Sequence, residues 1–262
     1  MSSDQSEPFT RVLAFHKSIP HFSFGSTNFS PVRLEQLLKQ LRSRNIRFVP
    51  ATFRPDRTAR DLSVALTFDD GYAHLAEVLP RLIDLFAIRP LIFIPTGWIG
   101  QTNRWDYSHY FRKDLHLDRP AIRMLAERGA EFGSHSHLHL DLTGLSQRRL
   151  EMELRQSKEI LEDAIRKPVK TISYPFGRST ELVRDAARRC GFEYGFTMRF
   201  PTPGDSSLSI GRIPVYGYDT PLSIAAKLSS GGLFFQTERL KCRVTNSLSG
   251  GTVLLNRLRR SH

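Results

Sequence analysis

Short apolar runs alternate with amphipathic stretches along most of the chain, and this alternation restricts the possible folds more than any other feature of the sequence. A parallel sheet or barrel of β-α units produces such a pattern, because each buried strand is followed by a helix with one apolar face. The runs VLAF, VALTF, LIFI, EFGS, TISY, YGFT and IPVY therefore predict seven strands, at residues 12–15, 64–68, 91–94, 131–134, 171–174, 194–197 and 213–216.

Five helices are predicted between these strands. In the fourth, Leu150, Leu154 and Leu161 recur at spacings of four and seven, which places them on one face of a helix. Gly129 and Gly191 each follow a predicted helix, as a left-handed cap requires. The sequence thus predicts an α/β protein with helices at residues 31–44, 72–86, 119–128, 146–166 and 180–190.

The length of 262 residues favours a single domain, and 40% hydrophobic with 24% charged residues excludes a disordered or fibrous chain. We expect a flexible N-terminus at residues 1–10 and a barrel at residues 11–220. A basic C-terminal appendage at residues 221–262 should pack on the barrel or trail from it. With only Cys190 and Cys242, a disulfide scaffold is excluded.

Neither a secretory signal nor a long apolar run is recognisable, so a soluble, cytoplasmic chain is predicted, with the inner membrane surface as a further location. The net charge of +12 favours contact with anions such as phosphate, uronate or lipid head groups. The alternative is a basic surface that is only solvated. Peripheral membrane contact therefore stays open, while no nucleic acid is expected as a partner, because no nucleic-acid motif is recognisable.

Unusual polar residues follow four of the predicted strands directly. They are His16, the pair Asp69 and Asp70, the segment 135–139 with three histidines, and the turn 175–177. Loops at the carboxyl ends of parallel strands converge on one rim, which is where active sites of such folds are built. The sequence predicts that these residues form one site.

Adjacent carboxylates after a buried strand repel each other unless a cation or a proton resolves the repulsion. A divalent metal could be held by one aspartate while the other acts as a general base. A plain turn with a helix cap is the alternative for Asp69 and Asp70. His135 and His139 can share a metal if their segment turns helically, with His137 pointing away, whereas surface histidines are the alternative.

These residues resemble the motifs of the polysaccharide deacetylases, carbohydrate esterase family 4. Its motif TFDDG stands at residues 67–71, its motif H-[ST]-x-x-H at residues 135–139, and its Pro-aromatic-Gly turn at residues 175–177, directly after the aromatic Tyr174. The resemblance spans roughly residues 12–215. It implies a single-domain, distorted (β/α)7 barrel and an enzyme that hydrolyses carbon–nitrogen bonds other than peptide bonds.

The resemblance also assigns roles at the site. One divalent ion, usually zinc, would lie on Asp70, His135 and His139, and Asp69 would take a proton from the attacking water. The backbone N–H of Phe176 would stabilise the oxyanion, for which one good donor contributes about 3–4 kcal/mol.

The chain departs from the family pattern in two places. The Leu-x-His motif that often supplies the general acid is missing, and His16 is the candidate in its place, against a structural role. The arginine before the third motif is also missing, so that Arg178 either replaces its pairing with the base or contacts an anionic substrate group. Substrate contacts are further expected from Tyr174, Pro175 and Trp105.

The leading prediction is removal of an N-acyl group, foremost N-acetyl, from an amino sugar in a polysaccharide, oligosaccharide or lipid-linked precursor. Alternatives are a deformylase of a polyprenyl-phosphate-linked amino sugar and a hydrolase of non-sugar amides. The non-enzymatic alternative is a glycan-binding pseudoenzyme, against which the intact set of aspartates and histidines argues.

Overall fold

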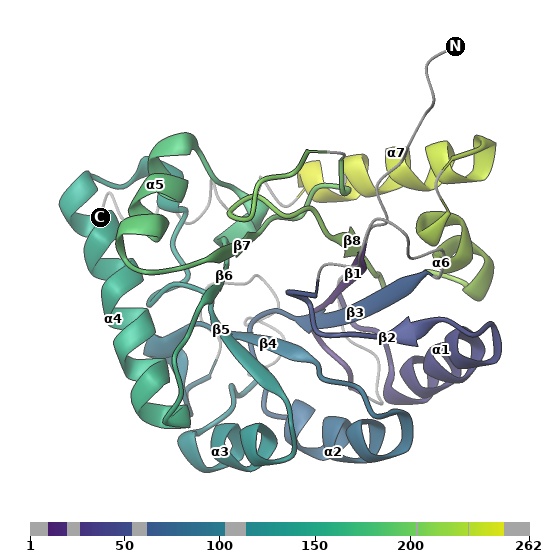
Figure 1. Cartoon of the computed structure of the whole chain (residues 1–262), viewed down its shortest axis with the longest axis horizontal. Helices are drawn as coiled ribbons and strands as arrows, with labels where there is room; N and C mark the ends of the chain where they lie inside the picture. The colour runs from purple at the N-terminus through teal and green to yellow at the C-terminus, as the bar shows by residue number, and fades with distance from the viewer. Residues whose placement is uncertain are drawn as a thin grey trace.

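A curved sheet of parallel strands forms the centre of the computed structural model (Figure 1), which describes residues 10–19, 27–53, 62–102, 114–202, 204–229 and 231–248. The strand order is β7-β6-β5-β4-β3-β1-β8, with β2 paired to β3. All seven predicted strands are present, and only the short β2 was not predicted. The strands are β1 (Thr10–Phe15), β2 (Arg47–Phe48), β3 (Ser63–Phe68), β4 (Leu91–Ile94), β5 (Glu131–Ser134), β6 (Thr171–Ser173), β7 (Tyr194–Phe196) and β8 (Ile213–Pro214).

Helices cover the outer face of this sheet (Figure 1). The five predicted helices are confirmed, and Gly129 and Gly191 follow α3 and α5 with φ angles of 98° and 83°, the left-handed geometry expected of such caps. The helices are α1 (Pro31–Ser43), α2 (Leu75–Phe86), α3 (Arg119–Glu127), α4 (Gln147–Ile165), α5 (Glu181–Arg189), α6 (Pro221–Leu228) and α7 (Leu233–Leu248).

Both faces of the sheet are buried, which explains why its strands are continuous apolar runs. Along β3, Val64, Leu66 and Phe68 belong to the large core between sheet and helices, whereas Ala65 belongs to a smaller inner cluster. Thr67, which faces the same side as Ala65, is buried too. The inner face thus passes from an apolar layer to polar side chains toward the carboxyl ends of the strands.

The sheet curls without closing along the described chain, so that β7 and β8 are its two edges. One isolated bridge, Phe196 to Ile210, links the two sides of this seam. Helix α7 lies beside it (Figure 1), with Cys242 buried and the ring of Phe235 packed edge-on against Phe200 at 5.7 Å. The expected flexible start and the end of the basic tail lie mostly outside the described residues.

No helix in the described ranges is long and apolar enough to cross a membrane.

Candidate metal and active site

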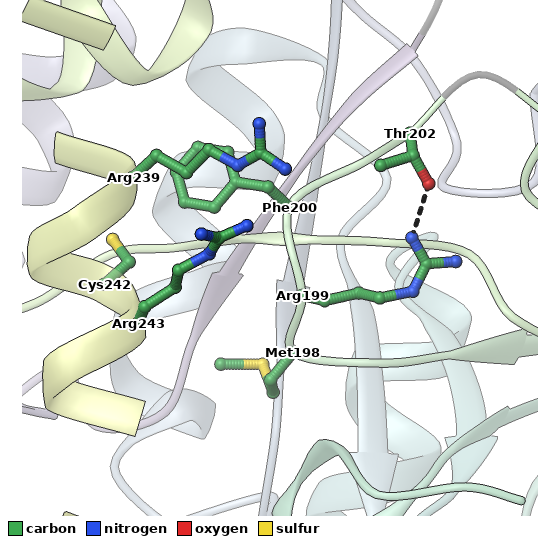
Figure 2. A pocket seen from close by; sticks show the side chains of 7 residues that line it. All are labelled: Met198, Arg199, Phe200, Thr202, Arg239, Cys242 and Arg243. Carbon is green, nitrogen blue, oxygen red and sulfur yellow. Dashed lines mark hydrogen bonds between the residues drawn. The ribbon is translucent and has the colours of Figure 1, made fainter. Parts of the chain in front are cut away.

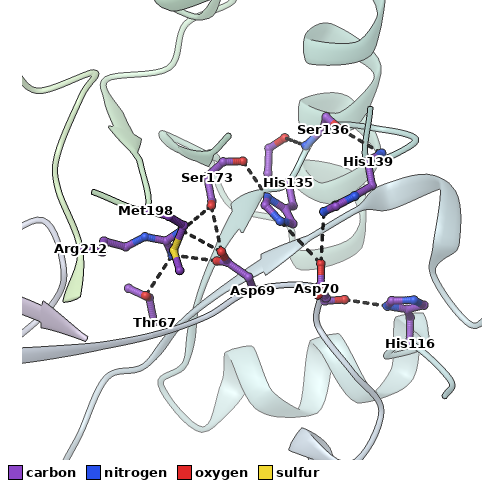
Figure 3. Close-up of polar contacts among 11 residues, drawn as sticks. Thr67, Asp69, Asp70, His116, His135, Ser136, His139, Ser173, Met198 and Arg212 are labelled. Atoms are coloured by element: carbon purple, nitrogen blue, oxygen red, sulfur yellow. Dashed lines mark hydrogen bonds and ion pairs between the residues drawn. The ribbon is translucent and has the colours of Figure 1, made fainter. Parts of the chain in front are cut away.

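Asp70, His135 and His139 converge at the carboxyl ends of β3 and β5 (Figure 3). Asp70 Oδ1 lies 3.6 Å from His135 Nε2 and 3.4 Å from His139 Nε2, and the three candidate ligand atoms lie within 4.8 Å of one another. A tetrahedral zinc ion with bonds of about 2.0–2.1 Å separates its ligand atoms by ~3.3 Å. The spacing and the chemistry of these side chains therefore fit one divalent ion.

The loop that carries both histidines is not helical, so the helical turn considered for residues 135–139 is not what brings the two rings together. Ser136 and His139 adopt positive φ angles of 61° and 56°, and the rings of His135 and His139 lie edge-on with centroids 4.8 Å apart. Such conformations cost on the order of 1–3 kcal/mol each and persist only where surrounding contacts enforce them.

Glu153 on α4 supplies these contacts from beneath the loop. Its buried carboxylate accepts the backbone N–H groups of His137 at 3.2 Å and Leu138 at 2.8 Å. Ser136 Oγ accepts the N–H of His139 at 3.1 Å. This role of Glu153 could not be predicted from the sequence, because Glu153 is a single carboxylate on the buried side of a helix whose pattern is otherwise amphipathic.

The two imidazoles are oriented for ligation. His135 Nδ1 lies 2.7 Å from the carbonyl oxygen of Ser173, and because a carbonyl only accepts, Nδ1 carries the proton and Nε2 is left with its lone pair toward Asp70. Burial lowers the pKa of both His135 and His139, that of His139 well below its ordinary value, which favours the neutral rings that bind metals. His116, absent from the predicted site, holds the backbone carbonyl of Asp70 with Nδ1 at 2.7 Å.

The predicted base, Asp69, forms a fully buried ion pair with Arg212 (Figure 3). Arg212 Nη1 and Nη2 donate to the two carboxylate oxygens at 2.7 Å each, and further bonds reach Ser173 Oγ, Thr67 Oγ1 and the carbonyl of Thr197. Burial alone would raise the pKa of Asp69, but the charge and hydrogen bonds of Arg212, together with contributions from His135 and His16, outweigh burial and hold this pKa well below its ordinary value. Asp69 is therefore ionised, as a base must be.

Arg212 makes the charge pairing with Asp69 that the family pattern assigns to the missing arginine. The prediction that Arg178 replaces it is wrong, because Arg178 is exposed and its Nε lies 3.6 Å from Asp141 Oδ2. One sequence signal for Arg212 existed: it directly precedes the apolar run of β8, and an arginine buried beside a core strand requires an acidic partner. Whether Arg178 contacts a substrate stays a prediction.

Phe176 lies in the short 3-10 turn η4 (Pro175–Gly177) beside the metal ligands. Its φ of 59° is left-handed, and its ring packs edge-on against His139 at 4.8 Å. Among the described residues its backbone N–H has no hydrogen-bond acceptor, whereas the N–H groups of Gly177 and Arg178 bond within the turn. An unpaired amide beside the ligands suits the expected oxyanion donor.

The residues predicted to contact the substrate do not all lie where a substrate could reach them. The side chain of Tyr174 is fully buried and its hydroxyl donates to the Leu208 carbonyl at 2.9 Å, so it supports the turn instead of facing a substrate. Pro175 is buried as well. His137 points away from the ligands as expected and contacts Thr96 Oγ1 at 3.0 Å. Trp105 lies outside the described residues.

His16 lies next to Asp69 across the sheet. Phe15 pairs with Phe68, and the N–H of Asp69 donates to the Phe15 carbonyl at 2.8 Å, so the next residues of both strands reach the rim together. Desolvation by the surrounding protein lowers the pKa of His16 to about 4, an effect that the Asp69 charge opposes. His16 thus lies at the same rim as Asp69, and its role as general acid stays a prediction.

The site combines a buried carboxylate and two imidazoles with an ionised carboxylate and an unpaired amide. A metal-dependent hydrolase uses groups of these kinds to bind its metal, activate water and stabilise an oxyanion. Residues 56–195, more than half of the chain, match the family model described as Polysaccharide deacetylase. The chain belongs to the polysaccharide deacetylase family. This confirms the resemblance seen in the sequence.

Curated relatives agree with this assignment. The chain is 28% identical to YxkH of Bacillus subtilis over 156 residues, which cover 60% of this chain but only 50% of that protein. It is 24% identical to the poly-beta-1,6-N-acetyl-D-glucosamine N-deacetylase of Staphylococcus aureus over 220 residues, 78% of this chain and 72% of the relative. The match thus spans about half the length of YxkH.

Solved structures confirm the fold. The Streptococcus pyogenes deacetylase PplD in complex with acetate superposes with a TM-score of 0.71 at 18% identity, covering 84% of this chain and 98% of that one. IcaB from Ammonifex degensii superposes with a TM-score of 0.69 at 21% identity, covering 84% and 96%. The fold is the distorted (β/α)7 barrel of polysaccharide deacetylases, as predicted.

Proposed function

We propose that the protein removes the N-acetyl group from an amino sugar in a polysaccharide, an oligosaccharide or a lipid-linked precursor. The observation that carries this proposal is the convergence of Asp70, His135 and His139 within 4.8 Å of one another, directly beside Asp69. A site with only the metal ligands would suit a binding protein. The additional buried ion pair of Asp69 with Arg212 maintains an ionised base where a hydrolase needs one, which argues against a pseudoenzyme.

In the proposed reaction, the metal ligands, Asp69 and the amide of Phe176 have separate roles. A divalent ion held by the three ligands, zinc by the preference of histidine and carboxylate sets, would polarise the acyl carbonyl and acidify water. Asp69 would accept the proton of the attacking water, and Arg212 keeps it ionised and fixed in direction. The amide N–H of Phe176 would donate to the oxygen that becomes negative as the tetrahedral intermediate forms.

His16 is the proposed general acid for the leaving amine. Its position beside Asp69 supports this role, while its pKa of about 4 means that the resting imidazole is neutral at pH 7 and has to gain its proton after substrate binds. Replacing His16 by Ala should lower kcat by about 10² or more with zinc content unchanged. A variant with normal zinc and near-normal kcat would assign His16 a structural role.

The decisive experiment measures bound metal and acyl release together. The purified protein is analysed for metals and then incubated with a panel of N-acetylated and N-formylated amino sugars, with Asp69→Asn as the blank. Release of acetate by the zinc-loaded protein but not by the blank supports the proposal, and release of formate alone identifies a deformylase. A fully loaded protein that releases neither, yet hydrolyses non-sugar amides, overturns the sugar assignment.

We also propose peripheral contact with an anionic membrane through α7. Leu233, Phe234 and Leu240 are 61–81% exposed on this helix, which also carries Arg239 and Arg243, a combination typical of helices that lie in the membrane interface. Phe234→Ser should weaken sedimentation with anionic vesicles. The control Leu182→Ser removes an equally exposed side chain from α5 and should not.

A further inference from the structure

A pocket of about 420 Å³ lies between α7 and the segment that follows β7 (Figure 2). Its apolar lining comes from Met198 and Phe200 on that segment and from Cys242 on the helix. Arg239 and Arg243, one helical turn apart on α7, extend their guanidinium groups over it. The pocket is thus apolar at its base and positively charged at its mouth.

The positive charge of the two helix arginines is not neutralised within the described part of the chain. Arg199 also lines the pocket, but its guanidinium donates hydrogen bonds to Asp205 Oδ1 at 2.6 Å and to Thr202 Oγ1 at 2.6 Å. Arg239 and Arg243 form no hydrogen bond or ion pair with any described residue. Two guanidinium groups without a carboxylate, facing the same hollow, indicate a site for an anion.

Met198 connects this pocket to the active site. Its Sδ accepts a hydrogen bond from Arg212 Nη2 at 3.4 Å, and Arg212 in turn holds Asp69 (Figure 3). Met198 also packs against the oxyanion turn, where a Cβ added to Gly177 would lie 2.5 Å from that of Met198. Met198 therefore lies between the pocket and the turn, and Met198 and Arg212 together lie between the pocket and Asp69, so the pocket adjoins the active site.

Building on the proposed deacetylation, we propose that this pocket binds a phosphate group of the substrate, so that the substrate is an N-acetyl amino sugar carrying a phosphate ester. A phosphate monoester carries a charge of about −1.5 to −2 and three terminal oxygens, so it neutralises two guanidinium groups more fully than the single charge of a carboxylate does. The volume exceeds that of a phosphate group alone, and the apolar base accommodates carbon atoms of the esterified group.

The test compares N-acetylglucosamine 1-phosphate with N-acetylglucosamine on the zinc-loaded enzyme. We expect the phosphorylated sugar to have at least a roughly tenfold higher kcat/KM, as one charge-assisted contact provides. In Arg239→Gln/Arg243→Gln, kcat/KM should fall about tenfold more for the phosphorylated sugar than for the neutral one. The control Lys241→Gln removes one positive charge from α7, as the single variant Arg243→Gln does, but Lys241 is paired with Glu238 and does not line the pocket, so the preference should persist.

Calorimetry separates this inference from the proposed activity. Asp69→Asn should bind N-acetylglucosamine 1-phosphate without turning it over, and the added arginine substitutions should weaken that binding about tenfold or more. The single variant Arg243→Gln, at an exposed position, repeats the measurement where the double variant is unstable. If neither sugar loses acetate, the proposed function fails, while the calorimetric result still decides the pocket.

Two outcomes overturn the phosphate assignment. One is equal kcat/KM and equal binding for the two sugars in the native protein. The other is that the arginine variants lose binding to phosphatidic acid vesicles while their preference for the sugar phosphate is unchanged, which would assign the pocket to a membrane head group.

Discussion

Replacing Arg212 by Met should leave Asp69 as an uncompensated carboxylate in the interior of the barrel. Arg212 is fully buried and Asp69 is 2% exposed, so water cannot take the place of the guanidinium. Removing one partner of a buried ion pair costs about 3–5 kcal/mol in the free energy of unfolding. The upper part of this range is expected, because the bonds of Arg212 to Ser173 and Thr67 are lost as well.

The same change should reverse the pH dependence of stability that Asp69 contributes. In the native protein its folded pKa lies below the ordinary value, so its contribution is present above about pH 4 and is lost as the pH falls. Without Arg212, burial raises this pKa, and the variant should lose stability as the pH rises above about 4.

Urea unfolding between acid and neutral pH, with a chelator present so that bound metal does not contribute, measures both effects. The double variant Arg212→Met/Asp69→Asn should recover part of the lost stability, because asparagine carries no charge. As a control, Arg128→Met breaks an exposed ion pair with Asp84 and should cost less than about 1 kcal/mol. An Arg212→Met variant within about 1 kcal/mol of the native protein, with unchanged pH dependence, would refute the reasoning.

Three further predictions concern the metal and its supports. Removing the ion with a chelator should abolish acyl release, and added Zn²⁺ should restore it; activity that survives with no metal detectable by mass spectrometry would contradict the proposal. Glu153→Gln should weaken zinc binding about 10–100-fold, measured by competition with a chelating dye, because it loosens the loop of His135 and His139. Phe176→Ala keeps the backbone donor, so kcat should fall by less than about tenfold, whereas a loss of 10² or more would show that the ring on His139 is required.

Much of the fold could be predicted from the sequence, because strands and helices are set by local periodicity. The four residues of β4 and of β5 coincide with the predicted runs, and α3 and α5 begin and end within one residue of the predicted ranges. The two-residue strand β2 was missed because it is too short to show a period and is partly exposed.

The candidate ligands were predictable for a related reason. Asp70, His135 and His139 follow buried strands, and the carboxyl ends of parallel strands meet at one rim whatever the details of packing. The loop geometry was not predictable from spacing alone. A separation of four suggested a helical turn, but two left-handed residues and the carboxylate of Glu153 bring the imidazoles together instead.

The sequence by itself determined the order of strands and helices along the chain, the set of candidate metal ligands and the rim on which they lie. Tertiary structure alone decided which cation neutralises the base, since Arg212 stands 143 positions after Asp69 and meets it only when β8 joins the sheet beside β1. It also decided that the pocket under α7 adjoins the active site through Met198. Periodicity depends on neighbours along the chain, whereas these contacts depend on how far the sheet curls toward closure, which no local pattern records.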